Sequence, residues 1–238
     1  MLPAATFVLR SAKGESMTDT DPQREGETLQ REYPDPSVLG GEVGLWMGSS
    51  ALNPMPAFQA KEAAAEVEEL GYAALWFGET AGREAFTNAS MFLCATSSLV
   101  VATGIANIFV RDAWATNAAT MTLAEAYPDR FVLGVGVSHR PMVEMRGHDY
   151  RSPLSTMRSY LKDMRHARFE AVPPEHDPPW IIAALGPRML ELSRDLADGA
   201  HPYLVTRSTP PEPAISWAKA LYWSWSRQWP LRASARRL

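Results

Sequence analysis

The 238-residue sequence has only one cysteine, Cys94, and no long apolar run. A single cysteine excludes an internal disulfide framework and is typical of a protein kept in a reducing cytoplasm. No apolar stretch approaches the ~20 residues of a membrane-spanning helix, so we expect no membrane partner. Positive charge is not in excess, because the net charge is −4, and we therefore expect no nucleic-acid partner.

The two ends of the chain differ in character from its middle. Residues 1–41 carry Asp, Glu, Gln, Arg, Pro and Gly without a sustained apolar period. Such a segment cannot offset the entropy of ordering itself, so we expect a disordered N-terminal extension. The folded unit is expected over 42–206, and 207–238 forms a third segment of different composition.

Residues 42–206 alternate between short apolar runs and amphipathic stretches. The sequence predicts strands over 43–47, 73–77, 99–109, 131–137, 180–185 and 200–205, and helices over 56–70, 87–97, 112–127, 153–167 and 187–197. Continuously apolar strands are typical of a parallel sheet covered by helices. Periodicity alone leaves a closed barrel and an open doubly wound sheet as alternatives. In both folds, ligands bind at the carboxyl ends of the strands.

Polar and glycine residues follow the expected strands and are the first candidates for a site. They are Glu79, Thr103, Gly104, Ser138, His139, Gly186, Arg188 and His201. An imidazole at a strand end suits acid–base chemistry, and His139 is as well explained by that role as by a structural one. Gly186 and Pro187 open a helix whose N-terminus could hold an anion. Arg188 could add charge there, although a solvated side chain is the commoner explanation.

Two other interpretations of the sequence are weak. Gly134 and Gly136 follow the pattern of a dinucleotide fingerprint, but its third glycine would fall at His139, so we reject it. His139, Glu144 and His148 have loose spacing for a metal site, and we expect no metal.

Four collinear blocks nevertheless resemble the luciferase-like monooxygenases and deazaflavin-dependent reductases. The blocks are LGYAALW at 70–76, VATGIAN at 101–107, AEAYPDRFVLGVG at 124–136, and IAALGPR at 182–188 running on to ADGA at 197–200. The resemblance covers residues 43 to about 206. It implies an α/β fold of the TIM-type (βα) barrel, here incomplete, with about six of eight strands.

The resemblance also implies a cofactor and a set of site residues. The cofactor would be coenzyme F-420, with riboflavin phosphate (FMN) as the alternative. The implied catalytic residues are His139 and Glu79, and the implied cofactor-binding residues are Thr103, Gly104, Ile105, Val137, Ser138, Leu185, Gly186, Pro187 and Arg188. Within this set, Gly104–Ile105 falls where the family often has a cis peptide, and 185–188 matches its phosphate-tail loop.

These residues imply a reaction class but no particular substrate. We expect hydride transfer between reduced coenzyme F-420 and a small organic molecule, with an FMN-dependent monooxygenase as the alternative and an inactive truncated remnant as the second. Thr80 stands where some deazaflavin dehydrogenases have histidine, and His139 where they have glutamate, so the reaction could differ from theirs. The chain could form a homodimer, and the sequence leaves the oligomeric state open.

The last segment, 207–238, does not resemble the family. Four of the eight tryptophans fall there, at Trp217, Trp223, Trp225 and Trp229. A frameshift explains this composition, with a tryptophan-rich docking helix as the alternative. If the barrel is truncated, its unclosed edges and exposed core predict poor solubility and weak activity.

Overall fold

The computed structural model describes residues 44–203, so the predictions for 1–41 and 207–238 lie outside the described residues. The strands are β1 (Gly44–Met47), β2 (Ala74–Phe77), β3 (Val100–Thr103), β4 (Ala106–Asn107), β5 (Phe131–Gly136), β6 (Trp180–Ala183) and β7 (Gly199–His201). The helices are α1 (Ser49–Leu52), α2 (Ala57–Glu69), α3 (Ala85–Ala95), α4 (Ala113–Ala126), α5 (Arg140–Glu144), α6 (Pro153–His166) and α7 (Pro187–Leu196).

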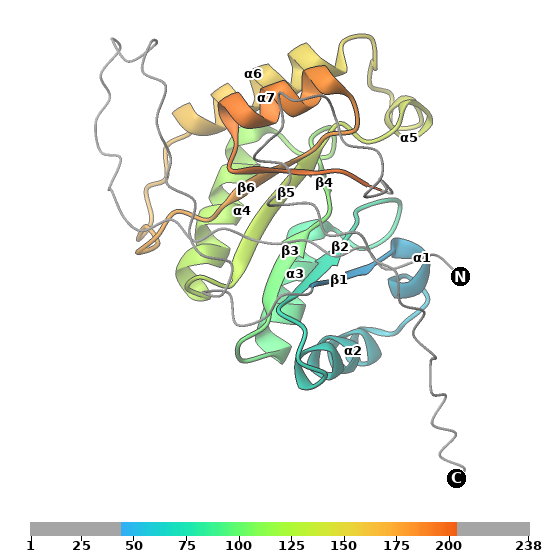
Figure 1. Cartoon of the computed structure of the whole chain (residues 1–238), viewed down its shortest axis with the longest axis vertical. Coiled ribbons are helices and arrows are strands. Elements are labelled where there is room, and N and C mark those ends of the chain that lie inside the picture. Colours follow the sequence, from blue (N-terminus) through green and yellow to red (C-terminus); the bar gives the residue numbers. More distant parts are fainter. Residues whose placement is uncertain (1–43, 204–238) are drawn as a thin grey trace.

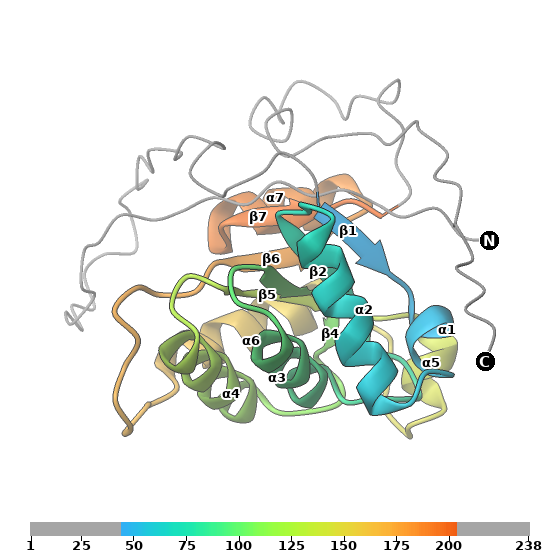
Figure 2. The ribbon, with the colours of Figure 1, turned by 90° about the horizontal axis from the view of Figure 1, so that it is seen from below.

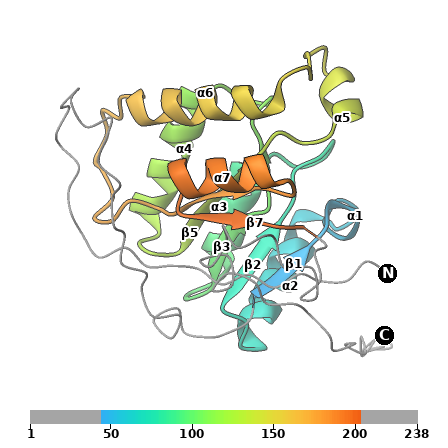
Figure 3. The same ribbon diagram turned by 45° about the horizontal axis from the view of Figure 1, so that its top comes forward.

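All strand pairs in this region are parallel. The order in the sheet is β1-β2-β3-β5-β6-β7, with β4 also pairing with β5. The sheet curls, and its helices lie on the outer side (Figures 1 and 2). Neighbouring helices pack on one another in the order α2, α3, α4, α6, α7, and α7 lies against β6 and β7 (Figure 3). Over residues 44–203 the architecture is part of a TIM-type α/β barrel, so the predicted fold class is confirmed.

The sheet is buried on both faces, and the side chains along each strand alternate between these faces. In β2, Leu75 and Phe77 pack into the large cluster beneath the helices, where Phe77 meets Phe92 edge to face. Ala74 and Trp76 point the other way, into a smaller cluster on the inner face of the curl. This double burial explains why the strands are apolar at consecutive positions.

Two details of the chain differ from the sequence prediction or refine it. Helix α3 begins at Ala85, two residues before the predicted start, because the Glu84 carboxylate accepts from the N–H groups of Phe86 and Thr87 and so caps it. The strand predicted over 99–109 is divided into β3 and β4. The peptide bond between Gly104 and Ile105 in that division is cis, as the resemblance implies.

The predicted cap of α4 is confirmed, since the Asp112 carboxylate accepts from the Ala115 N–H at 2.7 Å. The short helices α1 and α5 were not predicted, because four or five residues give too little periodicity to recognise. Within residues 44–203, no helix is both long enough and apolar enough to cross a bilayer.

Candidate functional site

The carboxyl ends of the strands carry the predicted site residues. Because the strands are parallel, the segments after β2, β5 and β6 leave the sheet along the same edge. Backbone hydrogen bonds link neighbouring segments there: the Glu79 N–H donates to the Ile105 carbonyl, and the Ala184 N–H to the His201 carbonyl. The fold thus gathers the predicted residues on one side of the molecule.

Glu79 lies buried at the end of β2 and is fully hydrogen-bonded. One carboxylate oxygen accepts from the Ala85 N–H at 3.1 Å and the other from the Asn107 N–H at 2.8 Å. The Arg111 guanidinium binds both oxygens and also reaches Glu84 at 2.7 Å. This geometry favours an anchoring role for Glu79 over proton transfer, because each oxygen already has two donors.

Thr103, at the end of β3, uses its hydroxyl inside the sheet. The hydroxyl donates to the Gly134 carbonyl at 2.7 Å and accepts from the Gly134 N–H at 2.8 Å. The two strands approach so closely that a Cβ on residue 134 would lie 1.8 Å from the Thr103 carbonyl oxygen. The approach therefore requires glycine, and it fixes the chain just before Gly104 and Ile105.

Aromatic side chains from β1, from β7 and from the residues just after β7 meet beneath Gly104. The Trp46 indole N–H donates to the Gly104 carbonyl at 3.0 Å, and its ring lies 5.2 Å from that of Tyr203. His201 packs edge-on against Trp76 at 5.5 Å. Burial lowers the pKa of His201 to about 4, so its imidazole is neutral at pH 7.

His139 lies at the mouth of β5 and is exposed. It occupies the N-cap position of α5, but its side chain makes no capping hydrogen bond. The preceding residue, Ser138, has a positive φ of 57°, which turns the chain sharply out of the strand. The Ser138 carbonyl accepts from the Tyr150 hydroxyl at 3.0 Å. Val137, before this turn, is half-buried and packs against the main core.

The segment Leu185–Arg188 between β6 and α7 is open to solvent. Leu185 is 65% exposed, and a Cβ at Gly186 would have no neighbour within 4 Å. The N-terminus of α7, a helix of ten residues, begins here at Pro187. A helix N-terminus carries partial positive charge, so with the exposed Arg188 it is suited to a phosphate group.

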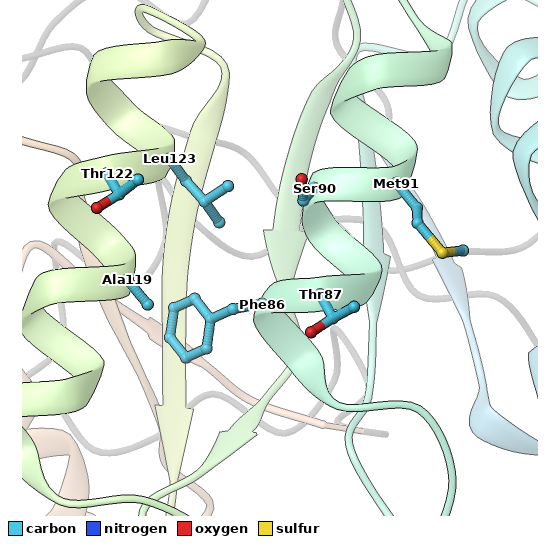
Figure 4. A pocket seen from close by; sticks show the side chains of 7 residues that line it. All are labelled: Phe86, Thr87, Ser90, Met91, Ala119, Thr122 and Leu123. Carbon is cyan, nitrogen blue, oxygen red and sulfur yellow. The ribbon is translucent and has the colours of Figure 1, made fainter.

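A separate groove of about 430 Å³ lies between α3 and α4 (Figure 4). It is lined by Phe86, Thr87, Ser90, Met91, Ala119, Thr122 and Leu123, and both helices belong to the outer layer. The groove is therefore distinct from the strand ends. Within residues 44–203, no group of three or more His, Cys, Asp or Glu side chains is arranged to hold a metal ion.

Three residues of this region were missed by sequence reasoning. Arg111 pairs with Glu79, Trp46 contacts Gly104, and Tyr150 binds Ser138. The alternation of β1 could have assigned Trp46 to the inner face. Arg111 and Tyr150 carry no such signal, because their partners are 32 and 12 residues away in the sequence.

Comparison with known proteins identifies a family and a fold. A sequence model of the family described as luciferase-like monooxygenase matches residues 37–214. A 5,10-methylenetetrahydromethanopterin reductase from Methanolobus tindarius is 24% identical in an alignment of 153 positions that covers 56% of this chain and 46% of the reductase.

Two solved structures share the fold at low identity. The coenzyme F-420-dependent tetrahydromethanopterin reductase from Methanopyrus kandleri superposes with a TM-score of 0.54 and 15% identity, over 66% of this chain and 54% of the reductase. An F-420-dependent secondary alcohol dehydrogenase, in complex with an F-420–acetone adduct, gives 0.58 and 18%, over 66% and 56%. The chain thus spans about half the length of these relatives.

Proposed function

This chain belongs to the luciferase-like monooxygenase family, and from that premise we propose that it is an F-420-dependent oxidoreductase acting on a small organic molecule. Members of the family are oxidoreductases and monooxygenases, which supports the enzyme class. The proposed cofactor and reaction rest on one observation. A curled parallel sheet gathers Gly104–Ile105, Ser138–His139 and Gly186–Arg188 along one edge. The likeness to two F-420-dependent proteins supports the choice of cofactor.

The residues at this edge fit a planar ring with a phosphate-bearing tail. The half-buried Trp46 indole and the half-buried Ile105 offer an apolar, largely uncharged surface for the ring, and the buried Gly104 lies between them. At Gly186 the backbone is bare and open, so a phosphate could approach the N-terminus of α7 with Arg188 beside it. Thr103 and Val137 would support the ring site from the protein side. The Thr103 hydroxyl is already hydrogen-bonded to Gly134, and Val137 packs against the main core.

Bound at this edge, the deazaflavin ring would supply the hydride-carrying chemistry, and the protein would supply orientation and proton transfer. Hydride transfer to a carbonyl or imine leaves an atom that needs a proton. The exposed imidazole of His139 is proposed to give or take that proton at a ring nitrogen. Glu79 is proposed to act indirectly, by fixing Arg111 and the strand ends through its four hydrogen bonds.

The inner face of the sheet would keep water away from the ring. Trp76, Val132 and Ile181 form a buried apolar cluster there, which lowers the local dielectric constant beneath the proposed seat.

The test is a titration of the full chain with coenzyme F-420 and with FMN, in which quenching of the cofactor fluorescence measures binding. We expect micromolar or tighter binding of F-420, and weaker binding of riboflavin than of FMN because riboflavin lacks the phosphate. The family description favours FMN-dependent oxygenation as a second candidate, and tighter binding of FMN than of F-420 would select it. Binding of neither cofactor would leave the inactive remnant as the explanation and overturn the proposal.

A further inference from the structure

The segment from Ser138 to Tyr150 forms a closed loop over the mouth of β5. It leaves the strand at Ser138, runs through α5, and returns so that the Tyr150 hydroxyl donates to the Ser138 carbonyl at 3.0 Å. Val143 anchors the loop from within, because it is completely buried. The carbonyl of His139 accepts from the N–H groups of Met142 and Val143, so the backbone of His139 is fixed while its side chain stays exposed.

Ser138 is the position on which the direction of this loop depends. Its φ of 57° lies in the left-handed region, which residues other than glycine rarely adopt. Asp129 is the other non-glycine residue with positive φ in the described part of the chain. A residue in this conformation persists only where its surroundings hold it there, and the Tyr150 hydroxyl is the side-chain group that binds its carbonyl.

Tyr150 is itself held in place from two sides. Its ring lies 6.2 Å from that of Phe109, which follows β4, and the Arg140 guanidinium lies 5.3 Å from its centroid. Arg140 is in turn paired with Glu144 at 3.1 Å. Burial, partly opposed by Arg140, raises the pKa of Tyr150 above its usual 10, so at neutral pH the phenol stays protonated and can donate.

We propose that Tyr150 is a positioning residue for His139: its hydroxyl holds the Ser138 peptide and thereby directs the His139 imidazole at the mouth of β5. The inference rests on the proposed function in taking His139 as the proton-transfer group. The substitution Tyr150→Phe isolates the hydroxyl, because it keeps the ring that contacts Phe109 and Arg140. Tyr72→Phe is the matched control, since Tyr72 is also half-buried but lies before β2, at the opposite edge of the sheet.

The first measurement is made on the full chain without cofactor. The protein is labelled with ¹⁵N-histidine, and the imidazole signals of His139 are identified by their loss in His139→Gln. We expect Tyr150→Phe to shift or broaden these signals, while the signals of His166 and His176 stay unchanged and the melting temperature falls by less than about 4 °C. Tyr72→Phe should leave the His139 signals as they are. Unchanged His139 signals in Tyr150→Phe would overturn the inference.

The second measurement adds coenzyme F-420 at saturation. In the wild type, the His139 signals should shift on binding. In Tyr150→Phe, the dissociation constant should stay within about twofold, because one peripheral neutral hydrogen bond is lost, while the cofactor-induced shift of His139 falls by half or more. An equal shift in both proteins would also overturn the inference. If the wild type binds no cofactor, the proposed function fails, and the measurement on the free chain still decides the role of Tyr150.

Discussion

The ends of β2 and β3 are built in the opposite way to the end of β6. Around Glu79 and Gly134, hydrogen bonds are saturated and backbones approach closely, with Arg111 held between two carboxylates. After β6, Leu185–Arg188 is exposed, and Gly186 has open space around it. The first region is suited to holding a fixed shape, and the second to receiving a charged group from outside. A site that combines them would seat a rigid ring on one side and a phosphate on the other.

The sharpest way to break this comparison is to add one methyl group to each region. Gly134→Ala would drive a Cβ to 1.8 Å from the Thr103 carbonyl oxygen, whereas Gly186→Ala would meet nothing within 4 Å. We expect Gly134→Ala to lower the free energy of unfolding by about 4 kcal/mol or more. Gly186→Ala should change it by less than about 0.5 kcal/mol. Urea denaturation followed by circular dichroism measures both, and similar losses would abolish the contrast.

The next largest effect is expected at the carboxylates around Arg111. Glu79→Gln would leave a largely buried guanidinium without its main partner and should cost about 3–4 kcal/mol of unfolding free energy. Glu84→Gln removes a carboxylate that is 41% exposed, and should cost about 1 kcal/mol through the weaker helix cap. The same urea experiment compares them. A smaller loss for Glu79→Gln than for Glu84→Gln would show that the buried pair does not anchor this region.

A third effect concerns pH and the buried face beneath Gly104. The pKa of His201 is about 4 in the folded chain and 6.5 in a model peptide, so the unfolded chain takes up the proton first as pH falls. The stabilisation from His201 is therefore complete above pH 6.5 and is lost progressively between pH 6.5 and 4, by about 3 kcal/mol. Unfolding at a series of pH values should show this loss in the wild type and its absence in His201→Asn. An NMR titration midpoint for His201 near 6.5 would contradict the prediction.

The smallest effect on stability is expected in the open region, where the effect on binding should be clearest. Arg188→Ala should change the free energy of unfolding by less than about 0.5 kcal/mol because the side chain is exposed. It should weaken F-420 binding about fivefold to tenfold, and the difference should shrink at high salt as charge is screened. Arg194→Ala, in the last turn of the same helix, is the control and should bind as the wild type does. Fluorescence titrations at two salt concentrations would decide between these outcomes.

Much of the fold followed from sequence, because its elements are defined by short-range patterns. The strand at 131–136 was predicted over 131–137, and α4 was predicted from its Asp112 cap and the proline after Tyr127. The division of 99–109 into two strands was not predicted. The family resemblance implied only the cis peptide bond between Gly104 and Ile105. Nothing in the apolar period marked that break.

The candidate site could be predicted only in part, because its details depend on long-range partners. Sequence placed Glu79 and His139 at strand ends, which depends on the order of strands alone. It could not distinguish their environments, since Arg111 saturates Glu79 from 32 residues away while His139 stays exposed. The roles assigned to the remaining cofactor-binding residues stay predictions, to be tested by the binding experiments above.

The ring contacts between the outermost strands have one more consequence. β1 and β7 end the row of strands in the described residues, and Trp46 of β1 contacts Tyr203, two residues after β7, across the curl without a ladder hydrogen bond. Such a contact fixes no strand register, so we expect small relative shifts of the two edges to cost less than they would across a hydrogen-bonded ladder. Because its indole is also tied to the Gly104 carbonyl, Trp46 is a native optical probe, read as the difference in emission between the wild type and Trp46→Phe because the chain has eight tryptophans. Its emission should report both the gap between the edges and, through energy transfer, the arrival of an absorbing ring beside it.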